Sequence, residues 1–342
     1  MSEPITIALD AMGGDIGPSV VVPAAIKMLR ANAAMRIILV GDETTVEAQF
    51  RDVPADTRNR LSIRHTTERV DMDELPSHAL RNKKDSSMRV AINLVKEGVA
   101  DACVSAGNTG ALMAIARFVL KTLPGIDRPA IITALPSLEG HTHVLDLGAN
   151  VDLDAEHLVQ LAIMGSVLST AVDKTERPRV GLLNVGQEEI KGNEVVKEAA
   201  QLLSNTPLNY IGFVEGDDIF KGGADVVVCD GFVGNVMLKS AEGVANMIAQ
   251  FLKEGFTRGI YGRIAGALAL PVLRRIGGRI DPRRYNGASL LGLQGTVIKS
   301  HGAADVVAFA NAIRIAQLEV HHAVPQNISR KLEELFSQRQ VG

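Results

Sequence analysis

Aromatic residues are scarce in this chain of 342 residues, which has no tryptophan, three tyrosines and nine phenylalanines. Proteins stack single-stranded nucleic acid on aromatic side chains, so few positions here could serve that purpose. The formal net charge of -3 also argues against a chain-wide basic surface. We therefore expect no nucleic-acid partner and a core of Val, Ile, Leu and Ala, as in parallel sheets buried on both faces.

Cysteine and long apolar runs are equally rare. Cys103 and Cys229 end apolar runs outside any Cys-x-x-Cys pair, so we expect buried structural thiols, with a catalytic thiol as the alternative. Residues 1–4 contain no basic stretch before an apolar one, and no window reaches the roughly 18 apolar residues of a membrane-spanning helix. These observations predict a cytoplasmic protein.

Known nucleotide and metal motifs are missing as well. Neither Gly-x-x-x-x-Gly-Lys-Ser/Thr nor Gly-x-Gly-x-x-Gly occurs, which disfavours a bound nucleotide or dinucleotide. The stretch 146–154 lacks the glycine and the distal Glu of a calcium loop. His141 with His143, and His321 with His322, lack the i, i+4 zinc arrangement with Glu. We expect no metal and no cofactor.

What the chain does have is a unit repeated four times: an apolar run, then a loop of Gly, Asn, Asp and Ser, then a segment that can form a helix. The four units are 7–15, 102–110, 180–186 and 226–235. In an open α/β sheet the carboxyl ends of parallel strands meet at one edge, where helix N-termini offer unpaired N–H groups to an anion. The pattern predicts an anion-handling α/β enzyme with these loops at one edge.

The predicted architecture is a three-layer α/β/α Rossmann-like fold with a mostly parallel sheet. Strand 5–10, a helix from Pro18 and strand 36–42 form an opening βαβ unit. Further strands are expected at 101–105, 130–135, 143–147, 180–184, 209–213 and 225–229, and the last helices at 304–322 and 326–336. No linker divides the chain, so we predict one domain over 1–342 with a projecting helical hairpin insert at 250–285.

Several loops could hold an anion. Small residues with hydroxyls and amides lie between a strand and an apolar helix, namely Ser105, Gly107, Asn108, Thr109 and Gly110. The segment 70–89 loses periodicity, and its Lys83 and Lys84 make it either an active-site loop or a solvated one. Lys191 is placed near the first turn of a helix, where it could stabilise an oxyanion or simply add surface charge.

Seven motifs that together span nearly the whole chain resemble one family, the bacterial acyl-ACP:phosphate acyltransferases of phospholipid synthesis. They are LDAMGGD (9–15), KKDSSM (83–88), VSAGNTGAL (104–112), GLLN (181–184), VCDGFVGN (228–235), YNGA (285–288) and KSHG (299–302). The helical insert agrees with this resemblance. Each motif is weak alone, but their order is specific.

The resemblance implies that inorganic phosphate attacks a long-chain acyl thioester on acyl carrier protein, giving acyl phosphate and free carrier. Phosphate is the nucleophile and a thiolate leaves readily, so positioning and oxyanion stabilisation suffice. It assigns catalysis to Lys191 and Asn235. The residues assigned to phosphate or substrate binding are Asp10, Gly13, Gly14, Asp15, Lys83, Lys84, Ser105, Gly107, Asn108, Thr109, Gly110, Asn184 and His301. A homodimer, and a downstream membrane acyltransferase that uses the acyl phosphate, are also expected.

The segment 253–284 carries eight Lys and Arg residues against two acidic residues, a net charge of +6 in a chain of net charge -3. An uncharged apolar stretch, 264–273, lies within it and is too short to span a bilayer. We expect a helical hairpin whose apolar tip enters the inner face of the cell membrane, while arginines meet anionic lipid or acyl carrier protein. The alternative is a core or dimer helix. The residues assigned to this surface are Arg263, Leu268, Leu270, Leu273, Arg274 and Arg275.

Three alternatives remain open. A phosphotransacetylase-like acyltransferase using coenzyme A and an isopropylmalate-type dehydrogenase share the layered α/β scaffold. A non-catalytic sensor that binds acyl chains or acyl carrier protein is the third. Phosphate-dependent release of free carrier separates the expected enzyme from a sensor.

Overall fold

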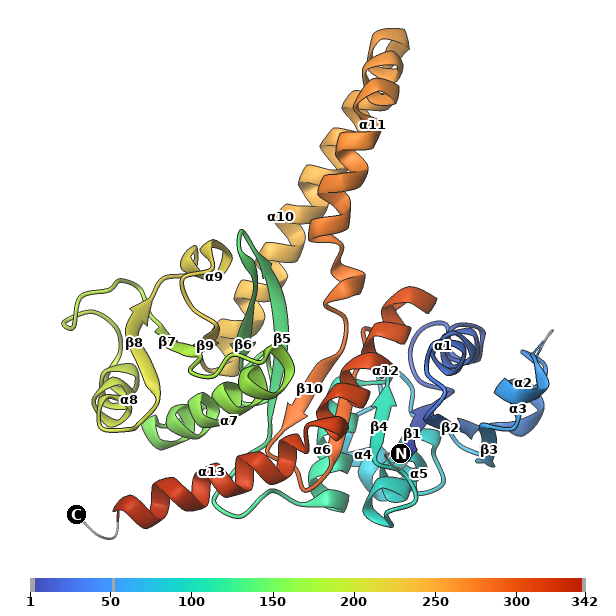
Figure 1. Cartoon of the computed structure of the whole chain (residues 1–342), viewed down its shortest axis with the longest axis horizontal. Coiled ribbons are helices and arrows are strands. Elements are labelled where there is room, and N and C mark those ends of the chain that lie inside the picture. The colour runs from blue at the N-terminus through green and yellow to red at the C-terminus, as the bar shows by residue number, and fades with distance from the viewer. Residues whose placement is uncertain (1–3, 51–52, 340–342) are drawn as a thin grey trace.

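The computed structural model describes residues 4–50 and 53–339 and is built on one sheet of eleven strands, in the order β3-β2-β1-β4-β11-β10-β5-β6-β9-β7-β8 (Figure 1). The strands are β1 (Ile5–Asp10), β2 (Met35–Gly41), β3 (Leu61–His65), β4 (Ala102–Ser105), β5 (Ala130–Ser137), β6 (Gly140–Leu145), β7 (Arg179–Leu183), β8 (Asn209–Val214), β9 (Val226–Val228), β10 (Ala288–Leu291) and β11 (Thr296–Lys299). Most pairings are parallel, as predicted; the antiparallel ones are β10 with β11, β10 with β5, and β5 with β6.

Helices cover both faces of the sheet, which confirms the three-layer prediction. Ile7 and Leu9 of β1 point into the core under α1 and α12, whereas Ala8 between them packs on the opposite face with α5 and α6. This alternation, with all three side chains buried, is what a strand covered on both sides requires. The second half of the sheet is covered by α7, α8 and α13 on one face.

The helices have the following bounds. They are α1 (Pro18–Ala31), α2 (Glu43–Glu47), α3 (Ala55–Arg58), α4 (Pro76–Asn82), α5 (Ser87–Lys96), α6 (Thr109–Leu120), α7 (Ala155–Asp173), α8 (Glu194–Ser204), α9 (Asp218–Lys221), α10 (Gly231–Thr257), α11 (Gly259–Ile280), the 3-10 turn η1 (Pro282–Arg284), α12 (Val306–His321) and α13 (Val324–Arg339).

Strand direction corrects the expectation that all four Gly-rich loops share one edge. The antiparallel hairpin of β5 and β6 reverses the chain within the sheet, and β9, β7 and β8 follow the direction of β6. The loops after β1 and β4 therefore follow strands of one sense, and those after β7 and β9 follow strands of the other. The apolar pattern of a strand does not reveal its direction, so the sequence could not show this reversal.

Two other predictions differ from the structure. The segment 70–89 is not one long loop, because it contains α4 and the start of α5. Helix α4 has only seven residues, of which Ala79 alone is buried, so its periodicity is too short to detect. Three strands were not predicted, namely β3, with five residues, and β10 and β11, with four residues each.

The helical hairpin is longer than the predicted 250–285, since α10 begins at Gly231 and α11 ends at Ile280. It projects well clear of the sheet and its covering helices (Figure 1). Small residues let the two helices approach: a Cβ on Gly262 would lie 2.6 Å from the carbonyl oxygen of Gly255, and one on Gly266 would lie 3.1 Å from Phe256 Cβ. The turn falls at Arg258 and Gly259, so the stretch 264–273 lies on the shaft of α11 and not at the tip.

Helix α7 qualifies by length and composition as a membrane-spanning helix, contrary to the expectation that no window is long enough. In the fold it packs against α8 and α13, and 56% of its apolar window is buried inside the protein. Its apolar residues therefore belong to the core.

Candidate active site

Asp10 is the centre of the first group of predicted site residues. It ends β1, is 1% exposed, and its carboxylate accepts hydrogen bonds from Ser87 Oγ and Ser105 Oγ, each at 2.6 Å. Burial raises the pKa of this carboxyl, while the bonds from Ser105 and Ser87 oppose the shift. One buried carboxylate thus joins the end of β1, the end of β4 and the start of α5.

Glycines allow the loops after β1 and β4 to interlock. A Cβ on Gly13 would lie 2.4 Å from Asp10 Oδ2 and 2.9 Å from the backbone nitrogen of Gly107. Gly14 has a φ of +87°, and a Cβ there would meet Ala106 and the carbonyl of Gly302. The loop after β11 joins them, because the Asp15 backbone N–H donates to the Gly302 carbonyl at 2.9 Å. The loops after β1, β4 and β11 therefore converge, and their backbones approach one another closely.

Lys299 is the buried cation of this group, and the sequence analysis did not single it out. Its ammonium donates to the carbonyls of Ala106, at 3.2 Å, and Ser300. Burial lowers its pKa to about 8, although the carboxylates of Asp10 and Asp15 favour the charged form. Its position in the KSHG motif was a signal, but only the pairing of β11 with β4 shows that it reaches the Ser105 loop.

Asn108 links the start of α6 to the segment that contains Met72 and Glu74. Its side-chain oxygen caps Ala111 N–H, and its amide donates to the carbonyls of Met72 and Glu74 at 2.8 and 3.0 Å. Both ends of the side chain are thus engaged, which indicates a positioning role. Thr109 and Gly110 are exposed in the first turn beside it.

The predicted lysine pair, Lys83 and Lys84, is connected to this group through the nearby Ser87. Lys83 is the C-cap residue just after α4 and is half-buried, and Lys84 is exposed. Two residues further, Ser86 caps α5, and Ser87 then bonds to Asp10. His301 is exposed at the end of the β11 loop, and its backbone N–H is held by Asn286 Oδ1 at 2.8 Å.

Lys191 lies in a loop stabilised by Asn184. The Asn184 amide donates to the carbonyls of Gly186 and Lys191, at 3.1 and 3.2 Å. Lys191 is not in a helix turn, because α8 is capped by Asn193 and begins at Glu194. Its ammonium forms an ion pair with Glu188 at 2.9 Å, and the hydrogen bond that it donates to the Glu188 carboxylate raises the pKa of Lys191. A charged lysine is therefore presented from an exposed loop after β7.

Asn235 lies in the first turns of α10, close to the loop after β6. A Cβ on Gly148 would lie 3.5 Å from Asn235 Cβ and Cγ, and one on Gly234 would lie 1.9 Å from the Asp146 carbonyl oxygen. Asp146 is buried and accepts hydrogen bonds from the backbone of Ile131 and from other groups of its own loop. Asp230 caps the helix through Phe232 and Val233 N–H, so Asn235 is not the cap. Its side chain is exposed.

The predicted site residues thus form separate groups. Asp10, Gly13, Gly14, Asp15, Ser105, Gly107, Asn108 and His301 gather around the loops after β1, β4 and β11. Asn184 and Lys191 share a second loop, and Asn235 lies in a third place beside Gly148. Within residues 4–50 and 53–339, neither Lys191 nor Asn235 hydrogen-bonds to the Asp10 group. Cys103 and Cys229 are buried, and burial raises the pKa of both thiols, which fits structural roles.

Solved structures with a similar fold include a phosphotransacetylase from Streptococcus pyogenes, with 18% identity, 93% of this chain and 94% of that chain covered, and a TM-score of 0.62. A branched-chain phosphotransacylase from Enterococcus faecalis has 14% identity, coverage of 93% and 99%, and a TM-score of 0.59. The protein is therefore an α/β protein with the fold of the phosphotransacetylases.

Sequence relatives specify the family within that class. The family model described as "Fatty acid synthesis protein" matches residues 5–327. Phosphate acyltransferase of Methylococcus capsulatus is 63% identical over 98% of this chain and 99% of the relative, and that of Legionella pneumophila is 55% identical over 98% of both. The chain belongs to the phosphate acyltransferase family.

Proposed function

We propose that this protein transfers a long-chain acyl group from the thioester of acyl carrier protein to inorganic phosphate, forming acyl phosphate for phospholipid synthesis. The observation that carries the proposal is the convergence of the loops after β1, β4 and β11 near Asp10, with Lys299 buried beside them. A buried cation among strand-end loops suits a small oxyanion. Full-length similarity to phosphate acyltransferases supports this assignment.

The reaction needs little covalent chemistry from the protein. A phosphate oxygen attacks the thioester carbonyl carbon, the tetrahedral oxyanion collapses, and the carbon–sulfur bond breaks. The carrier leaves as a thiolate, which takes a proton to become the free thiol, and the acyl phosphate retains the attacking oxygen. Positioning of phosphate and stabilisation of the oxyanion are the contributions the chain must supply.

Lys191 and Asn235 are the proposed oxyanion-stabilising groups. The Lys191 side chain is 46% exposed and charged, so it can leave Glu188 for an incoming anion. Asn235 is an exposed neutral donor on α10. Because the oxyanion forms on the carbon that phosphate attacks, this role requires both side chains to lie within hydrogen-bond reach of that carbon when the substrates are bound.

The apolar surface of the hairpin suits a second copy of the chain. Val244, Met247, Ile248, Phe251 and Leu252 of α10 are all exposed and recur at the three- and four-residue spacing of one helix face. Exposed faces of this kind mark interfaces. We propose that two hairpins pair through it in a homodimer, tested by molecular mass in solution with Met247→Glu and Phe251→Glu.

The tip of the hairpin is the proposed membrane contact. Ile260 and Tyr261 follow the turn and are 68% and 87% exposed, and Arg263 lies beside them. Leu268 is nine residues beyond Gly259, about 14 Å along the helix, deeper than the roughly 5 to 10 Å that interfacial helices enter. The proposed membrane anchor is therefore Ile260 and Tyr261 at the tip, in place of Leu268 and Leu270. The protein would then be cytoplasmic and bound to the inner face of the membrane.

Flotation with anionic vesicles tests this assignment. Tyr261→Glu should release a folded protein, whereas Leu268→Glu should leave it bound. Release by Leu268→Glu alone would place the anchor on the shaft, and binding by both variants would refute a hairpin anchor.

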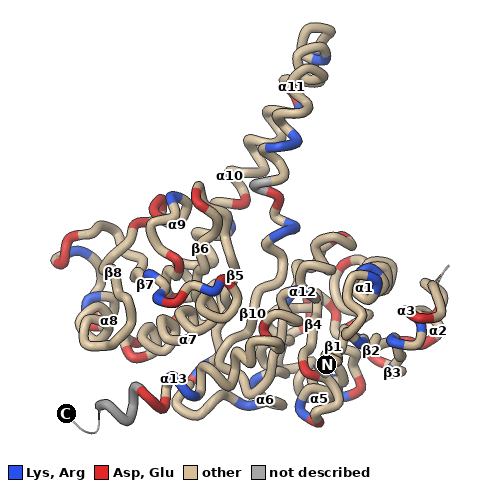
Figure 2. Tube along the Cα trace, in the orientation of Figure 1, with Lys and Arg blue, Asp and Glu red and all other residues tan. Residues whose placement is uncertain are grey.

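Arg274 and Arg275 are the proposed contacts for the acidic carrier. Both are exposed on α11, about 16 Å along the helix from Arg263 and nearer the sheet. Leu273, which precedes them, is half-buried. Figure 2 shows Lys and Arg along the projecting helix pair. Replacing both by Glu should raise KM for the carrier substrate and make it sensitive to salt, because rim charges govern association.

Phosphate-dependent release of free carrier from acyl carrier protein tests the main proposal. Acyl phosphate is trapped with hydroxylamine, which also separates transfer from hydrolysis. Equal turnover with acyl coenzyme A would favour a phosphotransacetylase-like activity, and stoichiometric binding without turnover would favour a sensor. A membrane acyltransferase that consumes acyl phosphate would act next.

A further inference from the structure

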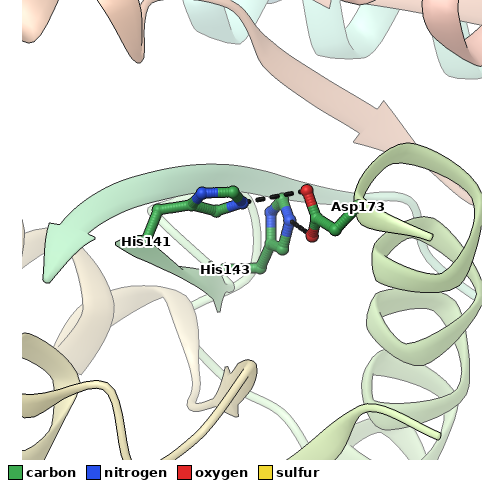
Figure 3. A group of neighbouring side chains, drawn as sticks. All are labelled: His141, His143 and Asp173. Atoms are coloured by element: carbon green, nitrogen blue, oxygen red, sulfur yellow. Dashed lines mark hydrogen bonds and ion pairs between the residues drawn. The ribbon is translucent and has the colours of Figure 1, made fainter. Parts of the chain in front are cut away.

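A second cluster of reactive side chains lies outside the candidate active site. His141 and His143 are two residues apart on β6, so their side chains leave the same face of the sheet. Asp173, the last residue of α7, faces both rings, with one carboxylate oxygen toward each (Figure 3). His141 Nε2 is 2.9 Å from Asp173 Oδ1, and His143 Nε2 is 2.7 Å from Asp173 Oδ2.

The three groups already have nearly the separation that a small metal ion requires. Their candidate ligand atoms all lie within 4.8 Å of one another, and the two rings cross at 87° with centroids 5.0 Å apart. Zinc binds nitrogen and oxygen at about 2.0 to 2.2 Å in a tetrahedron, which places ligands roughly 3.3 Å apart. Opening each contact by about half an ångström would therefore admit the ion.

Burial distinguishes this cluster from a surface pair of histidines. The His143 side chain is 7% exposed and Asp173 is 19% exposed, whereas His141 is 34% exposed. His143 and Asp173 would supply the less exposed ligands. The more exposed side of His141 would let the ion enter and would leave a fourth ligand position open to solvent. Ser169 Oγ donates to Asp173 Oδ2 at 3.2 Å, which orients the carboxylate from a second layer, as metal sites commonly do.

His143 uses one ring nitrogen, Nε2, for its contact with Asp173. Its Nδ1 atom is buried without a hydrogen-bond partner in the described part of the chain. Leaving a buried polar atom unpaired costs about 1 to 3 kcal/mol. The contact between Nε2 and Asp173 offsets part of this cost, and Nε2 is the nitrogen that faces the proposed metal position.

We propose that His141, His143 and Asp173 bind one divalent transition-metal ion of the zinc type. Two imidazoles and one carboxylate are a ligand set that suits this class, and a site with three protein ligands keeps one position for water. The sequence pattern shows His141 and His143 together but not Asp173, which is 30 residues away from His143. The ion would tie the end of α7 to β6.

This site is separate from the proposed catalysis. His141 and His143 occupy the first part of β6, whereas Asp146 and Gly148, near Asn235, follow its other end. Its loss should therefore change metal binding and stability while the acyl-transfer site remains intact.

The test is metal binding by the full chain after treatment with a chelator. We expect Zn²⁺ titration calorimetry to give one site per chain, and Co²⁺ to give the visible absorption of a four-coordinate complex. His141→Ala, at the exposed ligand, and Asp173→Asn should each weaken binding at least tenfold, and Zn²⁺ should raise the melting temperature only when all three residues are present.

His321→Ala with His322→Ala is the matched control. These residues form a ring pair of similar geometry, with centroids 5.1 Å apart and an angle of 81°, but no ion pair to a carboxylate is found for them among the described residues. The control should bind as the unaltered protein does. The proposal is overturned if the unaltered protein binds no ion, or if binding survives in both His141→Ala and Asp173→Asn. Because His141 is partly exposed, its variant remains informative even if Asp173→Asn unfolds.

Discussion

Ser105 Oγ donates to Asp10 Oδ2 at 2.6 Å across 95 residues of sequence. The same hydroxyl accepts a hydrogen bond from the Gly107 backbone N–H at 3.0 Å, so one side chain links the end of β1 to the loop that starts α6. This link gives the loops after β1 and β4 a common support, so substitutions here can test packing and the proposed phosphate binding separately.

Replacing Ser105 by Ala should both destabilise the protein and raise KM for phosphate. The change leaves the buried Gly107 N–H without its partner and removes one of the hydrogen bonds to Asp10, at a cost of about 1 to 3 kcal/mol. Ser87→Ala is the matched control, because it removes an Asp10 bond of equal length but no contact to Gly107. Chemical denaturation and phosphate kinetics measure the two effects; equal KM values in both variants would dissociate the Gly107 loop from phosphate.

Gly13→Ala should reduce activity strongly. The added Cβ would lie 2.4 Å from Asp10 Oδ2 and 2.9 Å from a backbone atom, so a loop must move, and loops displaced by about 1 Å can cost a hundredfold in rate. Gly216→Ala is the control, since a Cβ there meets nothing within 4 Å. Steady-state rates decide: a fully active Gly13→Ala protein would show that this loop plays no part in the reaction.

Lys191→Ala should lower kcat at least about a hundredfold while leaving the melting temperature unchanged, because oxyanion donors are worth about 2.7 to 4 kcal/mol and the side chain packs on no core. Lys197→Ala is a close control: Lys197 also pairs with a Glu three residues earlier, at 3.2 Å, but lies within α8. A fall of less than threefold would remove Lys191 from the mechanism.

The rate with limiting phosphate should fall as the pH rises through about 8. Burial lowers the pKa of Lys299 to about 8, so its ammonium loses its proton at that point, and with it the attraction for phosphate. Lys299→Met should be slow at pH 7 and show no such fall between pH 7 and 9. The measurement is kcat/KM for phosphate across this range. A fall that persists in Lys299→Met would assign it to another group.

Glu319→Gln should stabilise the protein at pH 8. Burial raises the pKa of Glu319 to about 7, against 4.5 for an ordinary glutamate, while its bond from Ser289 opposes the shift. The folded state therefore binds more protons between pH 4.5 and 7, and the free energy of unfolding falls as the pH rises through that window. The amide removes the buried charge and so recovers up to about 3 kcal/mol above pH 7.

Thermal melts of Glu319→Gln and the unaltered protein at pH 5 and pH 8 measure this effect. The two proteins should melt together at pH 5 and separate at pH 8, with the variant higher. Equal melting at both values would mean that Glu319 titrates normally. Ser289→Ala serves as a control for the hydrogen bond that Ser289 donates to Glu319.

The sequence by itself determined the class of fold and most of its elements. The apolar runs around Ile7, Val104 and Val227 are long enough to show strands, and Pro18 and Asn108 begin helices by local chemistry. The order of seven short motifs was sufficient for the family, since each motif is a local string of residues. These features depend on neighbours within a few positions, which a sequence displays directly.

Only the tertiary structure decided which side chains meet. The hairpin of β5 and β6 reverses the second half of the sheet, and this separates Lys191 and Asn235 from the Asp10 group. Strand pairing likewise brought Lys299 beside Ser105, and helix packing brought Asp173 to His143. Such contacts join residues tens of positions apart through strand direction and packing, and neither leaves a mark on local hydrophobic periodicity.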